Sequence, residues 1–307
     1  MRYTRLAIVV PAYKIEFFRA TLESLANQTC KDFTVYIGDD YSPADFLPLI
    51  NEYIDKIDIV YKRFENNLGG KDLVAQWTRC IEMTQGEPWI WLFSDDDVMG
   101  ERCVELFYNE INNRHQYDLY HFDVKIVDAN SNRVYTTKPY PEVLGSLDFY
   151  TKRYESFVVE YIFSRDIYDK LGGFVNFDLA WGSDRTTWVK FGNEKGIKTI
   201  HGDFVFWRKS NINITPNNDY NMACRKMSIN MDTTLWYKNY FNDLKVDRYV
   251  KYVVFRLYVF YSFLSKVDMN KILSKAVSNG LITDTEKKLL ITFLPIISVI
   301  YKIKKSL

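Results

Sequence analysis

The stretch WIWLFSDDDV at residues 89–98 places five consecutive apolar residues almost directly before three aspartates. Five residues are too few for a helix, and aromatic and branched side chains are typical of a buried β-strand. The strand predicted at Trp89–Phe93 therefore ends just before Asp95, Asp96 and Asp97. In open α/β sheets, ligands bind beyond the carboxyl ends of the strands, so the acidic triplet is expected to face a ligand.

Three more short apolar runs precede this one, and amphipathic stretches separate them. The predicted strands are Leu6–Val10, Phe33–Gly38 and Ile57–Tyr61, and the predicted helices are Phe17–Ala26, Ala44–Ile54 with Pro43 in its first turn, and Asp72–Met83. Strand, helix and strand at this spacing indicate right-handed βαβ units. The first hundred residues therefore predict an open, mostly parallel, Rossmann-like α/β sheet flanked by helices.

Polar residues also follow the other predicted strands. Pro11, Ala12 and Tyr13 follow the first strand, and the second ends in DDYS at residues 39–42. Two acidic clusters at neighbouring strand ends would repel each other without a cation or hydrogen-bond donors between them. Successive carboxylates favour a hard divalent cation, Mg²⁺ or Mn²⁺, which keeps coordination positions free for phosphate. The alternative is that the triplet caps the helix expected at Gly100–Asn113.

The second hundred residues predict a mixed layer, and the remainder is helical. The expected elements are a strand at 118–127 with a turn at 130–132 and a partner near Val134, a strand at Phe157–Phe163, a glycine helix cap at Gly172 and Gly173, a helix at Asp184–Lys195, strands at Lys198–Ile200 and Phe204–Trp207, and helices from Asp219 onward. Thr283 with Glu286 forms a capping-box signature.

Charge and hydropathy exclude two classes of partner or location. The 307 residues contain 40 Lys and Arg against 39 Asp and Glu, a formal net charge of +1, and this balance argues against nucleic acid as the main partner. No stretch reaches the ~20 apolar residues of a spanning helix, and Leu6–Val10 is too short for a signal peptide. We therefore expect a cytoplasmic protein that does not cross a membrane.

Five motifs in order resemble the family 2 glycosyltransferases. They are VVPAY at 9–13, IGDDYS at 37–42, GEPWIWLFSDDDV at 86–98, LGGF at 171–174 and WGSD at 181–184. The resemblance covers roughly residues 4–210. It implies the GT-A fold and an inverting, hexosyltransferase-like enzyme with a nucleotide-diphosphate sugar, expected to be a UDP-sugar, as donor. It also implies a catalytic domain at 1–215, with a donor half at 1–100 and an acceptor half at 101–215, before a helical C-terminal region at 216–307.

The family pattern implies roles for individual residues. Pro11, Ala12 and Tyr13 would line the nucleobase site, Asp40 would bind the base imide, and Asp95 would face the ribose. Asp96 and Asp97 would hold the metal that bridges the diphosphate. Asp184 matches the catalytic base, with Trp181, Gly182 and Ser183 shaping the acceptor side and Gly172 and Gly173 forming a turn beneath the donor sugar.

Basic residues in two places are candidates for donor binding. Lys71, after NNLGG at 66–70, could reach a phosphate, or it could be a solvated lysine. Many relatives place a histidine after the strand equivalent to Phe204–Trp207, but this chain has Arg208 and Lys209. Either of them could neutralise diphosphate charge, and Arg208 suits bidentate phosphate contacts. A metal would then have fewer protein ligands and bind mainly with the nucleotide.

The proposed roles agree with the chemistry of glycosyl transfer. A nucleoside diphosphate leaves with growing negative charge, which a cation stabilises, and the anomeric carbon becomes oxocarbenium-like. A carboxylate opposite the leaving group should take the proton of the acceptor hydroxyl, and Asp184 is the candidate. The alternative for Asp184 is an N-cap of the helix that follows, and one residue could serve both roles.

Other functions and the acceptor stay open at this point. A non-catalytic nucleotide-sugar-binding or scaffold protein is one alternative. A sugar-phosphate nucleotidyltransferase is another, although no glycine-rich phosphate loop follows the first strand. The resemblance suggests a glycan or lipid-linked acceptor in bacterial cell-surface polysaccharide assembly. The aromatic stripe at Tyr249–Leu264, with Lys287, Lys288, Lys302, Lys304 and Lys305, either contacts the inner membrane face peripherally or packs on the catalytic domain.

Overall fold

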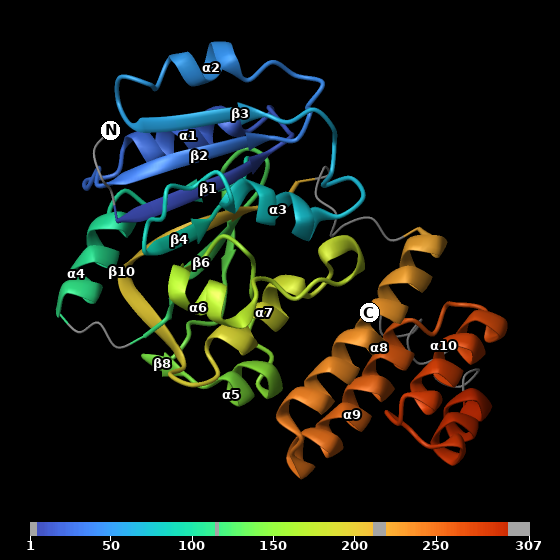
Figure 1. Ribbon diagram of the computed structural model, residues 1–307. Coiled ribbons are helices and arrows are strands. Elements are labelled where there is room, and N and C mark those ends of the chain that lie inside the picture. The colour runs from blue at the N-terminus through green and yellow to red at the C-terminus, as the bar shows by residue number, and fades with distance from the viewer. Residues whose placement is uncertain (1–4, 114–116, 211–218, 294–307) are drawn as a thin grey trace. The chain divides into compact units, whose positions relative to one another are not determined.

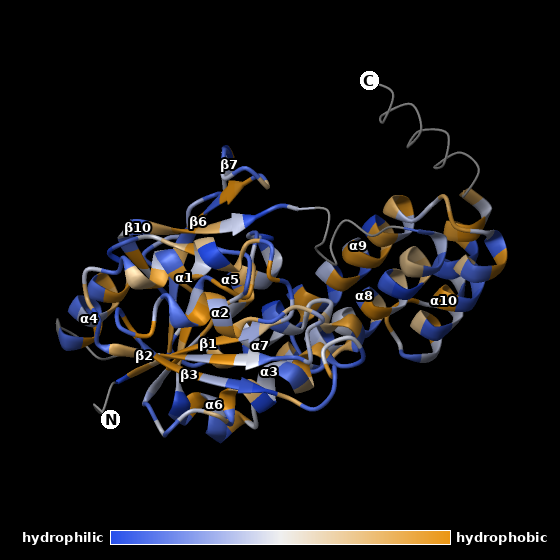
Figure 2. Ribbon diagram, turned by 90° about the horizontal axis from the view of Figure 1, so that it is seen from above, coloured by the Kyte–Doolittle hydropathy of each residue, from blue (hydrophilic) through white to orange (hydrophobic). Residues whose placement is uncertain are grey.

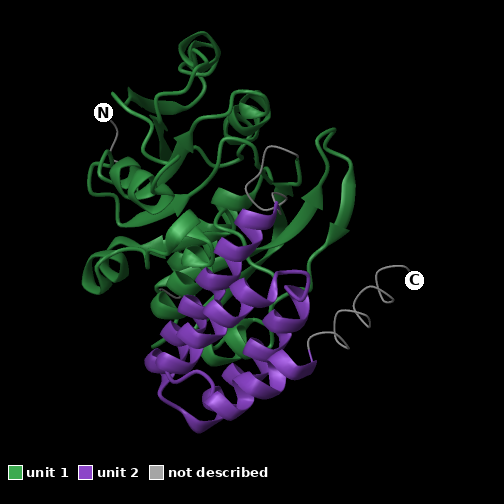
Figure 3. Cartoon of the chain, turned by 90° about the vertical axis from the view of Figure 1, so that its right-hand side faces the viewer, with its two compact units in different colours: residues 1–211 green, residues 212–307 purple. Residues whose placement is uncertain are grey.

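The computed structural model describes residues 5–113, 117–210 and 219–293, and the chain divides into two compact units. Unit 1 contains residues 1–211 and unit 2 contains residues 212–307, coloured green and purple in Figure 3. The domain boundary expected after residue 215 falls in a segment outside the described residues.

Within the described residues, unit 1 is built on a ten-stranded sheet (Figure 1). The main path has the order β3-β2-β1-β4-β9-β6-β10-β5, with β7 paired to β6 and β8 to β10. The strands are β1 Leu6–Ala12, β2 Phe33–Asp39, β3 Asp58–Arg63, β4 Trp89–Leu92, β5 Val98–Met99, β6 Leu119–Val127, β7 Arg133–Thr136, β8 Val143–Leu144, β9 Tyr161–Ser164 and β10 Ile197–Arg208. The first four are parallel, which confirms the predicted βαβ half.

Helices connect these strands and pack on the sheet. They are α1 Phe18–Ala26, α2 Leu47–Asn51, α3 Leu73–Ile81, α4 Cys103–Asn113, α5 Ser146–Thr151, α6 Arg165–Leu171, the 3₁₀ turn η1 Asp178–Ala180, and α7 Ser183–Phe191. Helix α3 packs on β1 and β2, whereas α4 packs on β10. Asp72 begins α3 by accepting a hydrogen bond from the Ala75 N–H (2.9 Å), as expected of an N-cap.

The apolar runs of the sequence form the centre of the sheet. Six of the seven residues of β1 are fully buried hydrophobics, Leu6–Val10 and Ala12, the pattern of a strand covered on both faces. Trp91 of β4 stacks on Phe122 of β6, with ring centroids 5.5 Å apart. Figure 2 shows the apolar colouring along β1, between helices that carry hydrophilic outer faces.

The structure corrects three element boundaries. The helix expected at Ala44–Ile54 is only the five-residue α2, and Pro48, not Pro43, lies in its first turn. The strand expected at Phe157–Phe163 begins at Tyr161, because residues 157–160 form the approach to β9. The two strands expected at 198–200 and 204–207 are one strand, β10, with an irregular register between Ile200 and Val205.

Unit 2 is helical throughout its described part. Its helices are α8 Tyr220–Phe241, α9 Leu244–Phe260 and α10 Lys266–Ser278, followed by helical residues 284–293. The capping box is confirmed, since the Thr283 N–H donates to Oε2 of Glu286 (2.7 Å) and the Glu286 N–H donates to the Thr283 hydroxyl (3.1 Å). Among the described residues, we find no helix whose length and apolar character would let it span a membrane. Lys302, Lys304 and Lys305 lie outside those residues.

Candidate functional site

Hydrogen bonds join the carboxyl ends of β1, β2 and β4 into one surface. Asp95, after β4, accepts from the backbone N–H groups of Tyr13 (2.7 Å) and Lys14 (2.6 Å), just beyond β1. The Ser42 hydroxyl, after β2, donates to the Tyr13 carbonyl (2.7 Å). Tyr13 itself keeps 45% of its surface exposed, so its ring is free to stack on a ligand. The structure therefore brings together the residues predicted from three separate motifs.

Asp39 fixes the turn at the end of β2. Its buried carboxylate accepts from the Ser42 N–H (2.8 Å), from the Tyr61 hydroxyl (2.7 Å) and from Nη1 of Arg63 (2.8 Å). Tyr41 sits within this turn with a left-handed φ of 55° and 55% of its surface exposed. Such a conformation is costly for a tyrosine, so the Asp39 bonds hold a strained residue beside the end of β1.

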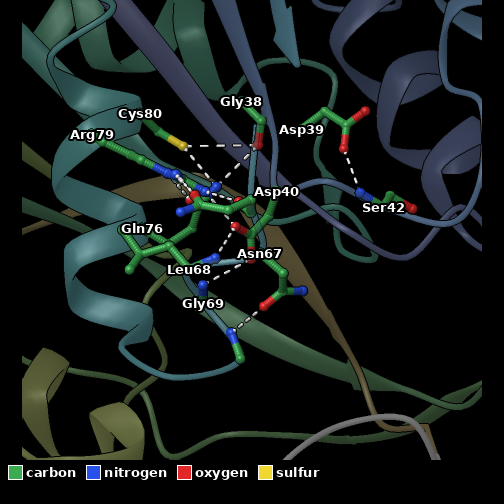
Figure 4. Close-up of polar contacts among 12 residues, drawn as sticks. Gly38, Asp39, Asp40, Ser42, Asn67, Leu68, Gly69, Gln76, Arg79 and Cys80 are labelled. Atoms are coloured by element: carbon green, nitrogen blue, oxygen red, sulfur yellow. Dashed lines mark hydrogen bonds and ion pairs between the residues drawn. The ribbon is translucent and has the colours of Figure 1, made fainter. Parts of the chain in front are cut away.

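Asp40 binds the loop between β3 and α3 (Figure 4). It accepts from the backbone N–H groups of Leu68 (2.7 Å) and Gly69 (2.9 Å), and the Arg79 guanidinium donates to it at 2.5 Å. If Asp40 also accepts from the imide of the nucleobase, as predicted, its buried carboxylate would bind that group together with those donors. Lys71 follows the same loop and its side chain is exposed, so Asp40 positions the segment that carries it.

Asp96 is paired with a lysine that the sequence reasoning did not select. The Lys14 ammonium hydrogen-bonds Oδ2 of Asp96 and lies 3.6 Å from Oδ1 of Asp95. These carboxylates raise the Lys14 pKa against the opposing effect of burial, which is the largest single influence. The signal in the sequence was a basic residue placed directly after the PAY motif.

Asp97 faces the protein interior. Its carboxylate accepts from the Ser94 hydroxyl (2.6 Å) and from the Arg208 backbone N–H (2.6 Å). Burial, followed by the charge of Asp96, raises the Asp97 pKa well above its usual value. A metal at Asp97 would have to share the carboxylate with these two donors.

Arg208 is placed beneath the triplet. Its side chain is 1% exposed, donates from Nε to the Asp96 carbonyl (2.8 Å), and reaches the Asp128 carbonyl (3.1 Å) and the Ser131 hydroxyl (3.0 Å). It also lies 4.6 Å from the centre of the Phe17 ring. A direct phosphate contact would take the guanidinium away from these partners, so in this structure Arg208 positions the Asp96 backbone.

The acidic triplet does not converge on one point. Asp95 turns to the backbone after β1, Asp96 to Lys14, and Asp97 to Ser94 and Arg208. Across residues 5–113, 117–210 and 219–293, no three His, Cys, Asp or Glu side chains are grouped so as to hold a metal ion. The described side chains therefore do not form a protein-built metal cage.

Asp184 lies in the first turn of α7. The N-cap of this helix is Gly182, with φ 81°, so the N-cap role considered for Asp184 is wrong. Burial raises the Asp184 pKa to about 6, partly offset by the Arg185 backbone N–H and the Arg185 charge. Leu179 and Ala180, just before it, have left-handed φ values of 58° and 52°, so strained backbone leads into this turn.

Trp181, Gly182 and Ser183 form the entry to α7. Trp181 and Gly182 are partly buried, and the fully buried Ser183 hydroxyl accepts from the Phe177 N–H (2.9 Å). Gly172 and Gly173 end α6 with φ values of 71° and 72°, as the glycine cap predicted. The Lys190 ammonium of α7 donates to the Leu171 carbonyl (2.5 Å), which ties this glycine turn to the helix of Asp184.

Glu160 links the two halves of the predicted site. It is fully buried just before β9, which runs antiparallel to β4, so it lies beside the end of the strand that precedes the triplet. Burial raises its pKa well above the usual value, and the nearby charges of Asp184 and Asp97 raise it further. Asp97 and Asp184, almost ninety positions apart in the sequence, therefore both act through their charge on the same buried side chain. The sequence analysis did not identify Glu160.

An open, mostly parallel α/β sheet with these side chains at its carboxyl edge is a GT-A-type fold. The chain belongs to glycosyl transferase family 2, because the model of that family, "Glycosyl transferase family 2", matches residues 7–172. This confirms the resemblance seen in the motifs.

Solved structures of S. aureus TarS are similar to the chain in fold. TarS residues 1–349 in complex with UDP-GlcNAc share 14% identity at a TM-score of 0.60, over 94% of this chain and 91% of that one. The same residues in complex with UDP share 14% identity at a TM-score of 0.58, over 97% and 89%. The longer TarS structure has 15% identity and a TM-score of 0.61, over 97% and 54%. No curated protein sequence matches the chain.

Proposed function

We propose that this protein is an inverting glycosyltransferase that moves a sugar from a nucleotide-diphosphate donor, a UDP-sugar, to an acceptor hydroxyl. The observation that carries the proposal is the hydrogen-bonded surface that Asp95, Tyr13 and Ser42 form at the carboxyl ends of β1, β2 and β4. Family membership and the UDP and UDP-GlcNAc complexes of the similar TarS structures support it.

The donor nucleotide would lie over the ends of β1 and β2. Pro11, Ala12 and the exposed Tyr13 would contact the base, with Asp40 accepting from its imide. Asp95 would face the ribose, and it already holds the backbone of the β1 end in place. Lys71 follows the loop that Asp40 orders and would contact a phosphate of the donor.

The divalent cation, Mg²⁺ or Mn²⁺, stays a proposal. Asp96 would be its first protein ligand, and Asp97 would join while shared with Ser94 and the Arg208 N–H. Because the Lys14 ammonium bonds Oδ2 of Asp96, a metal at Asp96 would share that carboxylate with the ammonium or displace it.

Asp184 would act as the general base. A carboxylate with a pKa of about 6 is mostly ionised at neutral pH and is more basic than a solvated aspartate, which suits removal of a hydroxyl proton. Trp181, Gly182 and Ser183 would shape the acceptor side, while Gly172 and Gly173 would lie beneath the donor sugar. General-base assistance of this kind contributes about 10²–10⁴ in rate.

The acceptor is proposed to be a glycan or a lipid-linked sugar. Unit 2 exposes Phe255, Phe260 and Phe263 to 46%, 52% and 50%, and Lys287 and Lys288 lie on its described surface. Exposed rings with nearby lysines suit peripheral contact with an anionic membrane face.

Thermal-shift measurements against a panel of nucleotide sugars test the donor proposal. A ligand at a hundredfold excess over its Kd stabilises the fold by about 2.7 kcal/mol, which raises the melting temperature measurably. We expect a UDP-sugar to give the largest shift and to release UDP on incubation. A stabilising ligand that is never hydrolysed or transferred would favour a non-catalytic binder, and no shift with any nucleotide sugar would refute the proposal.

A further inference from the structure

Lys14 occupies the position at which a sheet-edge cation would meet the acidic triplet. Its ammonium contacts Asp96 directly and lies 3.6 Å from Oδ1 of Asp95. Its side chain is 27% exposed, whereas those of Asp95 and Asp96 are 6% and 9% exposed. The lysine is therefore the member of this group that solvent, and hence a ligand, reaches most easily.

The ammonium retains capacity for an anionic ligand. A lysine ammonium has three donors, and the two carboxylates take at most two of them. The third donor is available to a phosphate oxygen, and a charge-assisted bond to phosphate is among the stronger polar contacts.

The protein also supplies a second cation beneath the triplet. The buried Arg208 guanidinium donates to the Asp96 carbonyl, so Asp96 lies between two positive groups of the chain. Asp95 is bound by backbone N–H groups of Tyr13 and Lys14, and Asp97 by Ser94 and the Arg208 N–H. The acidic triplet is thus held by backbone and hydroxyl donors and by two cations of the chain, Lys14 and Arg208.

We propose that Lys14 supplies, from within the chain, the positive charge that the diphosphate of the donor meets at the Asp95–Asp96 edge. Donor binding then does not require a divalent cation. The inference rests on the proposed function, because it assumes a nucleoside diphosphate ligand at this edge. It assigns the ligand contact to the Lys14 ammonium and leaves Asp96 to orient that ammonium.

Calorimetric titration with UDP, GDP, CDP, ADP and dTDP, in EDTA and in Mn²⁺, tests the inference. We expect wild-type protein to bind at least one of them, with UDP the tightest. Its affinities in EDTA and in Mn²⁺ should agree within about threefold. Binding in Mn²⁺ alone would overturn the inference while leaving the proposed function intact. Binding of none of them in either buffer would remove the proposed function itself, and the inference with it.

Two variants separate a phosphate contact from simple charge balance. Lys14→Met should weaken UDP binding in EDTA by at least about tenfold, the scale of one charge-assisted hydrogen bond, and Mn²⁺ should restore it through Asp96. In the double variant Lys14→Met/Asp96→Asn the repulsion between the carboxylates is removed. If Lys14 contacts phosphate, the double variant stays weak in both buffers, whereas wild-type affinity in the double variant would overturn the inference.

Lys170→Ala is the matched control. Lys170, on α6, forms an exposed ion pair with Glu194 (3.2 Å). Loss of this ion pair should leave UDP affinity unchanged. Thermal unfolding of each variant shows whether the fold is intact, so that a loss of binding is attributed to the ammonium only when the melting transition is retained.

Discussion

At the scale of single residues, the environment of Asp184 sets an expected pH dependence. Burial raises its pKa to about 6, and the base must be ionised to accept a proton. The rate should therefore fall as pH drops through about 6, because the protonated carboxyl accumulates below that value. We expect kcat/KM for donor turnover to show an acidic limb with an apparent pKa near 6. A limb near 4 would show that Asp184 is an ordinary solvated carboxylate.

Arg79 offers a second test at this scale. It neutralises the buried Asp40 and binds the Asn66 side chain (2.9 Å) and carbonyl (2.9 Å), so its removal leaves a buried charge unpaired. Arg79→Ala should lower the free energy of unfolding by about 2–4 kcal/mol, and Arg79→Ala/Asp40→Asn by less. Urea denaturation measures both.

The control for Arg79 is an exposed ion pair. Arg19 and Glu52 make a close pair with side chains 53% and 49% exposed, and Arg19→Ala should leave unfolding nearly unchanged. If Arg79→Ala behaves like Arg19→Ala, the Asp40 network does not hold the loop after β3.

The motifs located most of the donor-side residues because each one directly follows a predicted strand. Tyr13, Asp40 and Asp95 needed only the strand-end rule and the family pattern to be selected. The pairing of Lys14 with Asp96, and the burial of Arg208 under Asp96, join residues 82 and 112 positions apart. Local periodicity carries no information on such contacts, so the sequence could not show which groups Arg208 binds within the protein.

At the scale of elements, the packing of β2 against α3 depends on Gly38. A Cβ at this position would lie 2.3 Å from Sγ of Cys80 and 3.0 Å from the Phe64 ring. Gly38→Ala should cost about 1–3 kcal/mol of unfolding free energy through overpacking. In the Gly38→Ala/Cys80→Ala variant the clash with sulfur is gone, so the two changes should be less than additive. Strict additivity in a double-mutant cycle would contradict this packing.

The order of the elements was predictable, but the boundaries were set by tertiary contacts. The βαβ half was clear from alternating runs. β9 is shorter than expected, because Val159 and Glu160 are buried outside the strand and the Val159 carbonyl accepts from Nε1 of Trp91 (2.7 Å). Glu160 lay inside a predicted strand and gave no separate signal. Its place beside the end of β4 follows from the antiparallel pairing of β9 with β4, and sequence periodicity does not specify pairing.

At the scale of the whole molecule, the exposed rings of unit 2 predict membrane affinity. The full chain should sediment with anionic vesicles, and Phe255→Ser/Phe260→Ser should reduce the bound fraction by removing exposed apolar area. Val134→Ser, which changes an exposed residue of β7, is the matched control. Equal sedimentation of all three proteins would show that these rings do not contact the bilayer.

The central claim is that Asp184 takes the proton of an acceptor hydroxyl, which then attacks a donor bound over the ends of β1, β2 and β4. The most direct measurement compares wild type and Asp184→Asn for donor binding by calorimetry and for UDP release from the same UDP-sugar. The structure predicts equal binding and a loss of about 10²–10⁴ in turnover. Unchanged turnover in Asp184→Asn, with donor binding intact, would contradict the account.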